Sequence, residues 1–266
     1  MSKDIFMLCG SVREEELNLL DKNKFLANIK FDGERVMLIK KGTDIFLINR
    51  RGRNKNLQYP EIVEEIKQSK DNFILDGEVI TTDGLFNSFQ HRCNLSDRFK
   101  IEQAKKDYPI KFMVFDMLEL NEENLRNKHL FERVKILYSV IGEKFNFLEF
   151  AEYKSINEML FEAKLKQNEG IVIKDMNSVY EERRSDKWLK CKLWNEEVLR
   201  VIQFIDNPAG IRVEDKDKNA IQVAGYHSTM VKNKIVENGY CDIIVQFLSK
   251  TSKNKMRFPS FREVKK

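Results

Sequence analysis

Short apolar segments of strand length recur along this chain, and their pattern changes near Trp194. Before that residue, extended and helical segments are interspersed, which is typical of a mixed α+β domain. The extended segments are residues 25–30, 44–49, 72–80, 111–118 and 170–175, and the helical ones are residues 61–70, residues 126–144 and a stretch that begins at Ser155. Ser155 and Glu158 have the spacing of a capping box, which supports the last of these helices.

After Trp194 only short strands are predicted, with turns between them. The strands are residues 198–205, 211–214, 220–225 and 241–248, and the turns are Asn207-Pro208, residues 216–219 and Asn238-Gly239. About five strands in roughly 70 residues fit a small β-barrel of the oligonucleotide-binding kind. We therefore predict two domains, residues 1–194 and residues 195–266.

Composition places the chain among globular proteins, since 42% of its 266 residues are hydrophobic and 33% are charged. No apolar run approaches the roughly 20 residues of a membrane span, and the first 16 residues are too acidic for a signal peptide. The four cysteines and three histidines are scattered, which argues against a zinc site or a disulfide framework. We expect a monomeric cytoplasmic protein, either nucleoid-associated or intracellular viral, with no membrane partner.

The net charge of +5 is concentrated near the C-terminus, because residues 195–266 carry 13 cationic side chains and 9 acidic ones. From Lys250 to Lys266, seven cationic side chains accompany a single acid, Glu263. Such a segment favours contact with a polyanion such as nucleic acid. A solvated lysine-rich terminus would give the same pattern.

The segment from Lys30 to Arg35 lies between two strand-like runs and combines a lysine, an aspartate, a glycine and an arginine. A lysine amine is a covalent nucleophile only in its neutral form, which a nearby cation or metal favours. Asp32 could hold the waters of a divalent cation, and Gly33 would let a ligand approach the backbone. Arg35 could bind an anionic or hydroxyl-bearing group. A charged hairpin would carry the same residues, so this segment alone does not decide.

Four further segments place charged or aromatic side chains in or beside predicted strands. They are Asp76-Gly77-Glu78, Phe115-Asp116, Glu169-Gly170 with Lys174, and Lys190-Cys191-Lys192. An Asp-Gly pair inside a strand predicts close approach of another backbone or of a ligand. Strand alternation places the two lysines of the last segment on one face with Trp188 and Trp194. Structural interpretations remain open: a core aromatic for Phe115, a helix-end charge for Glu169 and an exposed strand face for the two lysines.

In this order the five segments resemble the motifs of the covalent nucleotidyltransferases, the superfamily of ATP-dependent DNA ligases, RNA ligases and messenger-RNA capping enzymes. The resemblance runs from about residue 27 to residue 265 and is closest to the small ATP-dependent DNA ligases. Three further stretches look like ligase segments: Asn49-Arg50-Arg51-Gly52 with Tyr59-Pro60-Glu61, Phe89-Gln90-His91-Arg92, and residues 125–133 with residues 178–180 and 184–190. Arg257-Phe258-Pro259 resembles the start of the family's sixth motif. The sequence departs from the family pattern at Lys265, where the resemblance implies an arginine.

The resemblance implies an adenylyltransferase domain followed by an oligonucleotide-binding barrel, with ATP and Mg²⁺ or Mn²⁺ as cofactors and nicked duplex DNA as substrate. The catalytic residues it implies are Lys30, Lys190 and Lys192. The nucleotide would be bound by Asn28, Ile29, Lys30, Arg35, Glu78, Phe115, Lys174, Lys190 and Lys192, the metal by Asp32 and Glu169, and DNA by Arg50, Arg92 and Arg257. Within this set, Asn28 would read the base, Phe115 would stack on it, Glu78 would bind the ribose and Arg50 would bind the nick phosphate.

Alternatives remain at the level of function. An RNA ligase or a capping-type enzyme would use the same lysine chemistry, and an inactive nucleic-acid-binding relative would keep only the binding. The 29 residues before Lys30 leave no room for an extra DNA-binding domain. Duplex contact would then come from residues 85–106, which otherwise form a charged surface helix, from the second domain, or from a clamp or end-binding partner.

Overall fold

The computed structural model describes residues 5–141, 144–251 and 254–265 and divides the chain into two compact units. Unit 1 covers residues 1–191 and unit 2 covers residues 192–266. Among the described helices, none is long and apolar enough to cross a bilayer.

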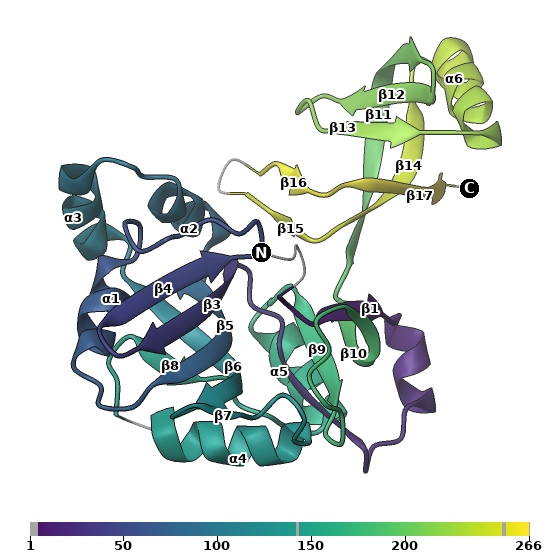
Figure 1. Ribbon diagram of the computed structural model, residues 1–266. Coiled ribbons are helices and arrows are strands. Elements are labelled where there is room, and N and C mark those ends of the chain that lie inside the picture. Colours follow the sequence, from purple (N-terminus) through teal and green to yellow (C-terminus); the bar gives the residue numbers. More distant parts are fainter. Residues whose placement is uncertain (1–4, 142–143, 252–253, 266) are drawn as a thin grey trace. The chain divides into compact units, whose positions relative to one another are not determined.

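Unit 1 contains two sheets within the described residues (Figure 1). The first has the strand order β1-β10-β9-β2, in which β1 (Leu8–Ser11) runs parallel to β10 (Arg184–Lys192) and β2 (Phe25–Ile29) runs antiparallel to β9 (Gly170–Asp175). The second has the order β4-β3-β5-β6-β7. Its strands are β3 (Glu34–Lys41), β4 (Asp44–Asn49), β5 (Phe73–Thr81), β6 (Ile110–Leu120) and β7 (Glu123–Asn124), with β8 (Leu148–Phe150) parallel to β6.

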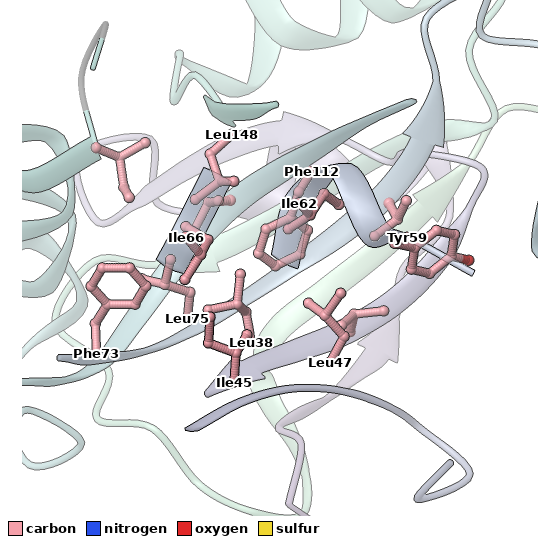
Figure 2. Packing of buried hydrophobic residues seen from close by; sticks show 14 of the residues in the cluster. Leu38, Ile45, Leu47, Tyr59, Ile62, Ile66, Phe73, Leu75, Phe112 and Leu148 are labelled. Carbon is pink, nitrogen blue, oxygen red and sulfur yellow. The ribbon is translucent and has the colours of Figure 1, made fainter. Parts of the chain in front are cut away.

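Helices cover one face of the second sheet. Helix α1 (Pro60–Lys67) begins with a proline, whose missing N–H costs nothing at that position. Its Ile62 and Ile66 pack against Leu38, Leu75 and Phe112 of the sheet, as Figure 2 shows. Helix α4 (Leu130–Ile141) adds Leu137 and Ile141 to the same core. The other helical elements of unit 1 are the 3₁₀ helix η1 (Glu14–Leu19), α2 (Phe86–Cys93), α3 (Arg98–Asp107) and α5 (Ile156–Leu165).

The opposite face of the second sheet is also buried, because neighbouring strand residues point to opposite sides. Met37 and Ile74 form a further cluster with Phe6, Tyr180 and Trp188. Trp188 belongs to β10 of the first sheet. This cluster therefore packs the two sheets of unit 1 against each other.

Two glycines mark places where strand backbones meet. A Cβ on Gly77 would lie 2.6 Å from the carbonyl oxygen of Met113, which confirms the close approach predicted for the Asp-Gly pair. A Cβ on Gly33 would lie only 2.0 Å from the carbonyl oxygen of Val79. A side chain at position 33 would therefore collide with β5, and the absence of one lets the two strand backbones approach closely.

Unit 2 holds a sheet of order β13-β12-β11-β14-β17 and a short hairpin of β15 and β16. These strands are β11 (Asn195–Asn207), β12 (Gly210–Asp215), β13 (Ala220–Val223), β14 (Cys241–Phe247), β15 (Ser249–Lys250), β16 (Met256–Arg257) and β17 (Ser260–Val264). Helix α6 (Tyr226–Asn238) packs Val231 and Ile235 on this sheet and ends at Gly239, whose φ of +79° suits a glycine. The sequence analysis predicted no helix there.

Most predicted segments of unit 1 match observed elements to within a few residues. The capping box is confirmed, since the Ser155 hydroxyl accepts from the Glu158 N–H and the Glu158 carboxylate accepts from the Ser155 N–H. Residues 85–106 contain α2 and α3, so the helical interpretation is correct in kind. The predicted helix 126–144 is shorter at its start, and residues 142–143 lie outside the described residues.

Arg92 requires a correction, because the sequence analysis expected it to bind DNA. Its side chain is fully buried in α2 and donates two hydrogen bonds of 2.8 Å to the Glu61 carboxylate of α1. It also donates to the carbonyl of Gln58. A guanidinium with no exposed surface cannot reach a phosphate, so Arg92 instead fastens α2 to α1.

We predict that Arg92→Ala lowers the free energy of unfolding by about 3–5 kcal/mol, because it leaves the Glu61 charge buried without its partner. Urea unfolding followed by circular dichroism measures this loss. Arg98→Ala, an exposed arginine of α3, is the matched control and should change stability by about 0.5 kcal/mol or less. Equal stability of the two variants would contradict the buried role.

Candidate active site

A cavity of about 600 Å³ lies between the two sheets of unit 1. The first sheet contributes side chains from all four of its strands, and the second contributes from β3, β4, β5 and β6. Nine of the residues singled out from sequence line this cavity: Asn28, Ile29, Lys30, Arg35, Arg50, Glu78, Phe115, Lys174 and Lys190. Residues from six separate stretches of the chain thus converge on one site.

Lys30 follows β2 directly, and its backbone N–H donates to the carbonyl of Gly170 at the start of β9. Its amine forms an ion pair with the Glu169 carboxylate. The side chain of Lys30 is 22% exposed and that of Glu169 is 10% exposed, so the pair lies at the cavity wall rather than on open surface. Strand pairing of β2 with β9 therefore brings the first and fourth segments of the sequence pattern together.

Arg35 binds protein groups with most of its guanidinium. It donates to both oxygens of Asp76, at 2.9 and 2.6 Å, and to the carbonyl of Met7 at 2.8 Å. Burial by itself lowers the pKa of this guanidinium, but the Asp76 carboxylate outweighs it and raises the pKa above its ordinary value. Arg35 still lines the cavity, as an anchored cation rather than a mobile one.

Glu78 of β5 is paired directly with Arg35 of β3 in the antiparallel register of these two neighbouring strands. Burial raises the pKa of the Glu78 carboxyl to about 8, against the opposing effect of Lys30, Arg35 and a hydrogen bond from the Gly33 backbone. A carboxyl in this condition exchanges its proton near neutral pH.

Lys174 lies among aromatic side chains at the wall of the cavity. Its Nζ is 4.2 Å from the ring centroids of both Phe115 and Trp188 and 2.9 Å from the Tyr153 hydroxyl. Burial lowers the pKa of Lys174 to about 7, although Asp116, Cys9 and Asp76 act in the opposite direction. Phe115 itself is half-buried and keeps a surface on the cavity.

The Asn28 side chain is buried and oriented by the main chain. Its amide nitrogen donates to the carbonyls of Ala151 at 3.2 Å and Glu152 at 2.7 Å. Among the described residues, its Oδ1 has no hydrogen-bond partner. With both N–H groups committed, the hydrogen-bonding capacity left to the Asn28 side chain is that of an acceptor, on an oxygen that is itself buried.

The remaining predicted residues lie outside the cavity lining. Asp32 lies two residues after Lys30 in the sequence, and Glu169 forms the ion pair with Lys30. Among the described residues, no three or more His, Cys, Asp or Glu side chains form a group that could hold a metal ion. Lys192 and Arg257 belong to unit 2. There Lys192 lies over the rings of Trp194 and Phe258, at 5.4 and 5.5 Å, and Arg257 donates to the Ser249 hydroxyl at 3.3 Å.

The sequence analysis assigned no role at the cavity to several of its lining residues, including Glu34, Arg51, Arg53, Val172 and Arg184. Val172 could have been found, because it alternates with Gly170 and Lys174 along one predicted strand. Glu34, Arg51 and Arg184 stand in segments that were singled out. Arg53 has no comparable signal, since its approach to the cavity depends on a loop.

The raised pKa of Glu78 predicts a pH-dependent stability. Between about pH 4.5 and pH 8 the unfolded chain has lost this proton while the folded protein retains it, so folding is weakened as the pH rises. We expect the unfolding free energy of wild type, relative to Glu78→Gln, to fall from pH 5 to pH 8. Urea titrations of both proteins at four pH values measure it, and parallel pH profiles would contradict it.

The part of the chain that contains the cavity residues is similar to known proteins. Residues 6–192 match the family model described as the ATP dependent DNA ligase domain. "DNA ligase 1" of Methanosarcina acetivorans is 34% identical over 205 residues, covering 70% of this chain and 35% of that protein. The "DNA ligase" of Sulfolobus acidocaldarius is 30% identical over 183 residues, covering 64% and 30% respectively. The chain therefore spans about a third of the length of these curated relatives.

Solved structures extend the likeness in fold to nearly the whole chain. A mycobacterial DNA ligase D complexed with ATP and MES has a TM-score of 0.64 at 18% identity and covers 98% of this chain and 95% of its own. A structure from a study of DNA binding by the minimal scaffold of Lig E DNA ligases has a TM-score of 0.71 at 16% identity, covering 98% and 100%. These matches confirm the predicted fold class, an adenylyltransferase domain followed by an oligonucleotide-binding barrel. Since the family model matches 187 of the 266 residues, the chain belongs to the family of ATP-dependent DNA ligase domains.

Proposed function

We propose that this protein is an ATP-dependent DNA ligase that joins the 3′-hydroxyl and 5′-phosphate of a nick in duplex DNA. The observation that carries the proposal is the position of Lys30, a lysine held at the wall of a cavity that cations and an aromatic ring line on facing sheets. Family membership supports the same chemistry. Unit 1 would carry the nucleotide chemistry, and unit 2 would add cations for the DNA backbone.

In the first step the Lys30 amine attacks the α-phosphate of ATP. A P–N bond forms, the bond to pyrophosphate breaks, and the amine gives up a proton, for which the Glu169 carboxylate is already in contact. Lys190, which also lines the cavity, would balance the charge that develops on the phosphate. Lys192 is our candidate for the same task.

The AMP group then moves to the 5′-phosphate of the nick, and the 3′-hydroxyl displaces AMP as it forms the new phosphodiester bond. Arg50 is exposed and lines the cavity, which fits a residue that binds the nick phosphate. Arg257 is our candidate for backbone contact in unit 2. Recruitment by a clamp or end-binding protein, a monomeric state and a cytoplasmic location stay predictions from sequence.

Adenine fits the polar groups of the cavity better than guanine does. The free Oδ1 of Asn28 can accept from the amino group of adenine, whereas guanine presents an oxygen acceptor at the equivalent edge. Phe115 offers a ring for stacking, and Glu78 offers oxygen atoms for the ribose hydroxyls. Lys174 would contribute to nucleotide binding by its contact with the Phe115 ring. Arg35, anchored on Asp76, would bind through what remains of its guanidinium.

A divalent metal fits this site as a companion of the nucleotide. Mg²⁺ keeps several waters and usually takes one or two carboxylates together with substrate phosphates. Asp32 and Glu169 provide two such carboxylates beside Lys30, and Mn²⁺ accepts the same donors. When bound, the metal would neutralise phosphate charge.

We predict that Lys30→Ala abolishes both the covalent protein–AMP adduct and nick sealing, because no other group replaces the nucleophile. Radiolabelled ATP with Mg²⁺ detects the adduct, and gel electrophoresis of nicked duplexes detects sealing. Lys22→Ala, an exposed lysine of the preceding turn, is the control and should retain both activities. Adduct formation by Lys30→Ala would contradict the assignment, and sealing confined to RNA-containing nicks would favour an RNA ligase.

We also predict that wild type forms the adduct with ATP in preference to GTP, and that Asn28→Ala reduces this preference about tenfold, as the loss of one hydrogen bond in a buried site implies. Competition labelling with the two nucleotides measures the ratio, which a general loss of stability would not change. Asn18→Ala, at an exposed position, is the control. A preference unaltered by Asn28→Ala would remove Asn28 from base recognition.

A further inference from the structure

Three arginines occupy one short loop at the edge of the cavity. Arg50, Arg51 and Arg53 follow β4, are exposed, and all line the cavity. Long cationic side chains on an exposed loop lose conformational entropy when they bind, and this loss weakens binding. A loop with a fixed backbone lowers that cost and aims the side chains.

Asn49 fixes the backbone of this three-arginine loop. Its Oδ1 accepts from the N–H groups of Arg51 and Arg53, at 3.0 and 2.9 Å. Its own N–H donates to the carbonyl of Arg53 at 3.0 Å, and its carbonyl accepts from Gly52 at 2.8 Å. Gly52 has a φ of +73°, which this tight turn requires. The side chain of Asn49 is thus the centre around which the loop closes.

Glu34 holds Asn49 in turn. Its Oε1 accepts from the Asn49 amide at 2.8 Å, while its Oε2 accepts from the Tyr59 hydroxyl at 2.8 Å and lies 3.3 Å from the Lys55 amine. Asn49 and Tyr59 are buried, and the Glu34 side chain is 22% exposed. Burial and the Glu34 charge raise the pKa of Tyr59, so its hydroxyl stays a donor. Both carboxylate oxygens of Glu34 are therefore used to hold neighbouring groups in place.

The position of Glu34 in the chain gives this arrangement its significance. It is the first residue of β3 and lies only four residues after Lys30, in the same segment as the proposed nucleophile. The path from Lys30 to the loop thus crosses one short stretch of backbone and two hydrogen bonds. A displacement of about 1 Å at a reacting group costs roughly 100-fold in rate, so the distance between nucleophile and loop matters for transfer to a second phosphate.

We propose that Glu34, acting through Asn49, is a positioning residue that sets the three-arginine loop for the phosphate backbone at the nick. The inference rests on the proposed ligase function and adds to it a residue whose two carboxylate oxygens are both engaged by other protein groups. A purely structural role would affect every step of the reaction alike. A positioning role affects the steps that involve DNA.

The test separates those steps for Glu34→Ala. Formation of the protein–AMP adduct is followed without DNA, and sealing is followed by mixing the purified adduct with increasing concentrations of nicked duplex. We expect the KM for nicked DNA to rise, or the sealing rate to fall, by about 10- to 100-fold, with a loss of about threefold or less in adduct formation. Glu119→Gln, which alters an ion pair of β6 with Lys41 away from the cavity lining, is the control and should match wild type in both steps.

Two further comparisons sharpen the result. Glu34→Gln keeps an acceptor oxygen and should regain part of the lost sealing. The losses caused by Arg50→Ala and Glu34→Ala should be less than additive in the double variant, because Glu34 acts in part through Arg50. If Glu34→Ala does not fold, Tyr59→Phe, which removes a single donor, and Asn49→Ala are measured instead and should show the same step-specific loss.

Equal losses in adduct formation and sealing, unchanged sealing, or additive effects in the double variant would each overturn the inference. Failure of the proposed function looks different. In that case wild type itself would not seal the nicked duplex, whatever the behaviour of the Glu34 variants.

Discussion

The buried ion pair of Arg35 and Asp76 is the interaction on which the cavity depends. Arg35 belongs to β3 and Asp76 belongs to β5, and the Arg35 guanidinium also donates a hydrogen bond to the carbonyl of Met7. The Tyr180 hydroxyl donates to Asp76 at 2.7 Å and accepts from the Met7 N–H at 3.0 Å. Met7 and Tyr180 lie just before the strands β1 and β10 of the other sheet. One closed set of charge-assisted bonds therefore fixes the two sheets between which the cavity lies.

A second buried pair supports the floor of the site. Asp116 accepts two hydrogen bonds of 2.8 Å from Arg133 of α4, and both side chains are fully buried. The neighbouring Phe115 carbonyl accepts from the Tyr153 hydroxyl, which in turn accepts from Lys174. Buried charges are costly unless each is paired, so these groups constrain one another closely. The Phe115 ring consequently rests on a rigid base, which suits a surface for stacking.

The convergence of several candidate residues on one cavity could be predicted from the sequence, because these residues recur at strand ends where side chains converge. Lys30, Glu78, Phe115 and Lys190 line the same cavity as the motif order implied. The errors lie where long-range packing decides. As an arginine in a positively charged segment, Arg92 was expected to contact DNA. It pairs instead with the buried Glu61, about 30 residues away in the chain, and no local sequence pattern reveals this pairing. Helix α6 was missed for a related reason. Its amphipathic pattern is weak, and the helix is stabilised by the packing of Val231 and Ile235 on the sheet of unit 2.

The pairing of β3 with β4 also links the segment that carries Lys30 to the three-arginine loop. The two strands pair directly, with Val36 opposite Asn49, so Glu34 and the three-arginine loop lie near the same end of one hairpin. The nucleophile segment leads into one strand, and the loop leaves the other. In the function we propose, any shift of the hairpin would move Lys30 and Arg50 together. Because β3 is hydrogen-bonded to β4 on one side and to β5 on the other, the sheet resists such shifts. In the proposed function, the distance between the AMP phosphate on Lys30 and the 5′-phosphate of the nick would then be set by backbone pairing rather than by flexible side chains.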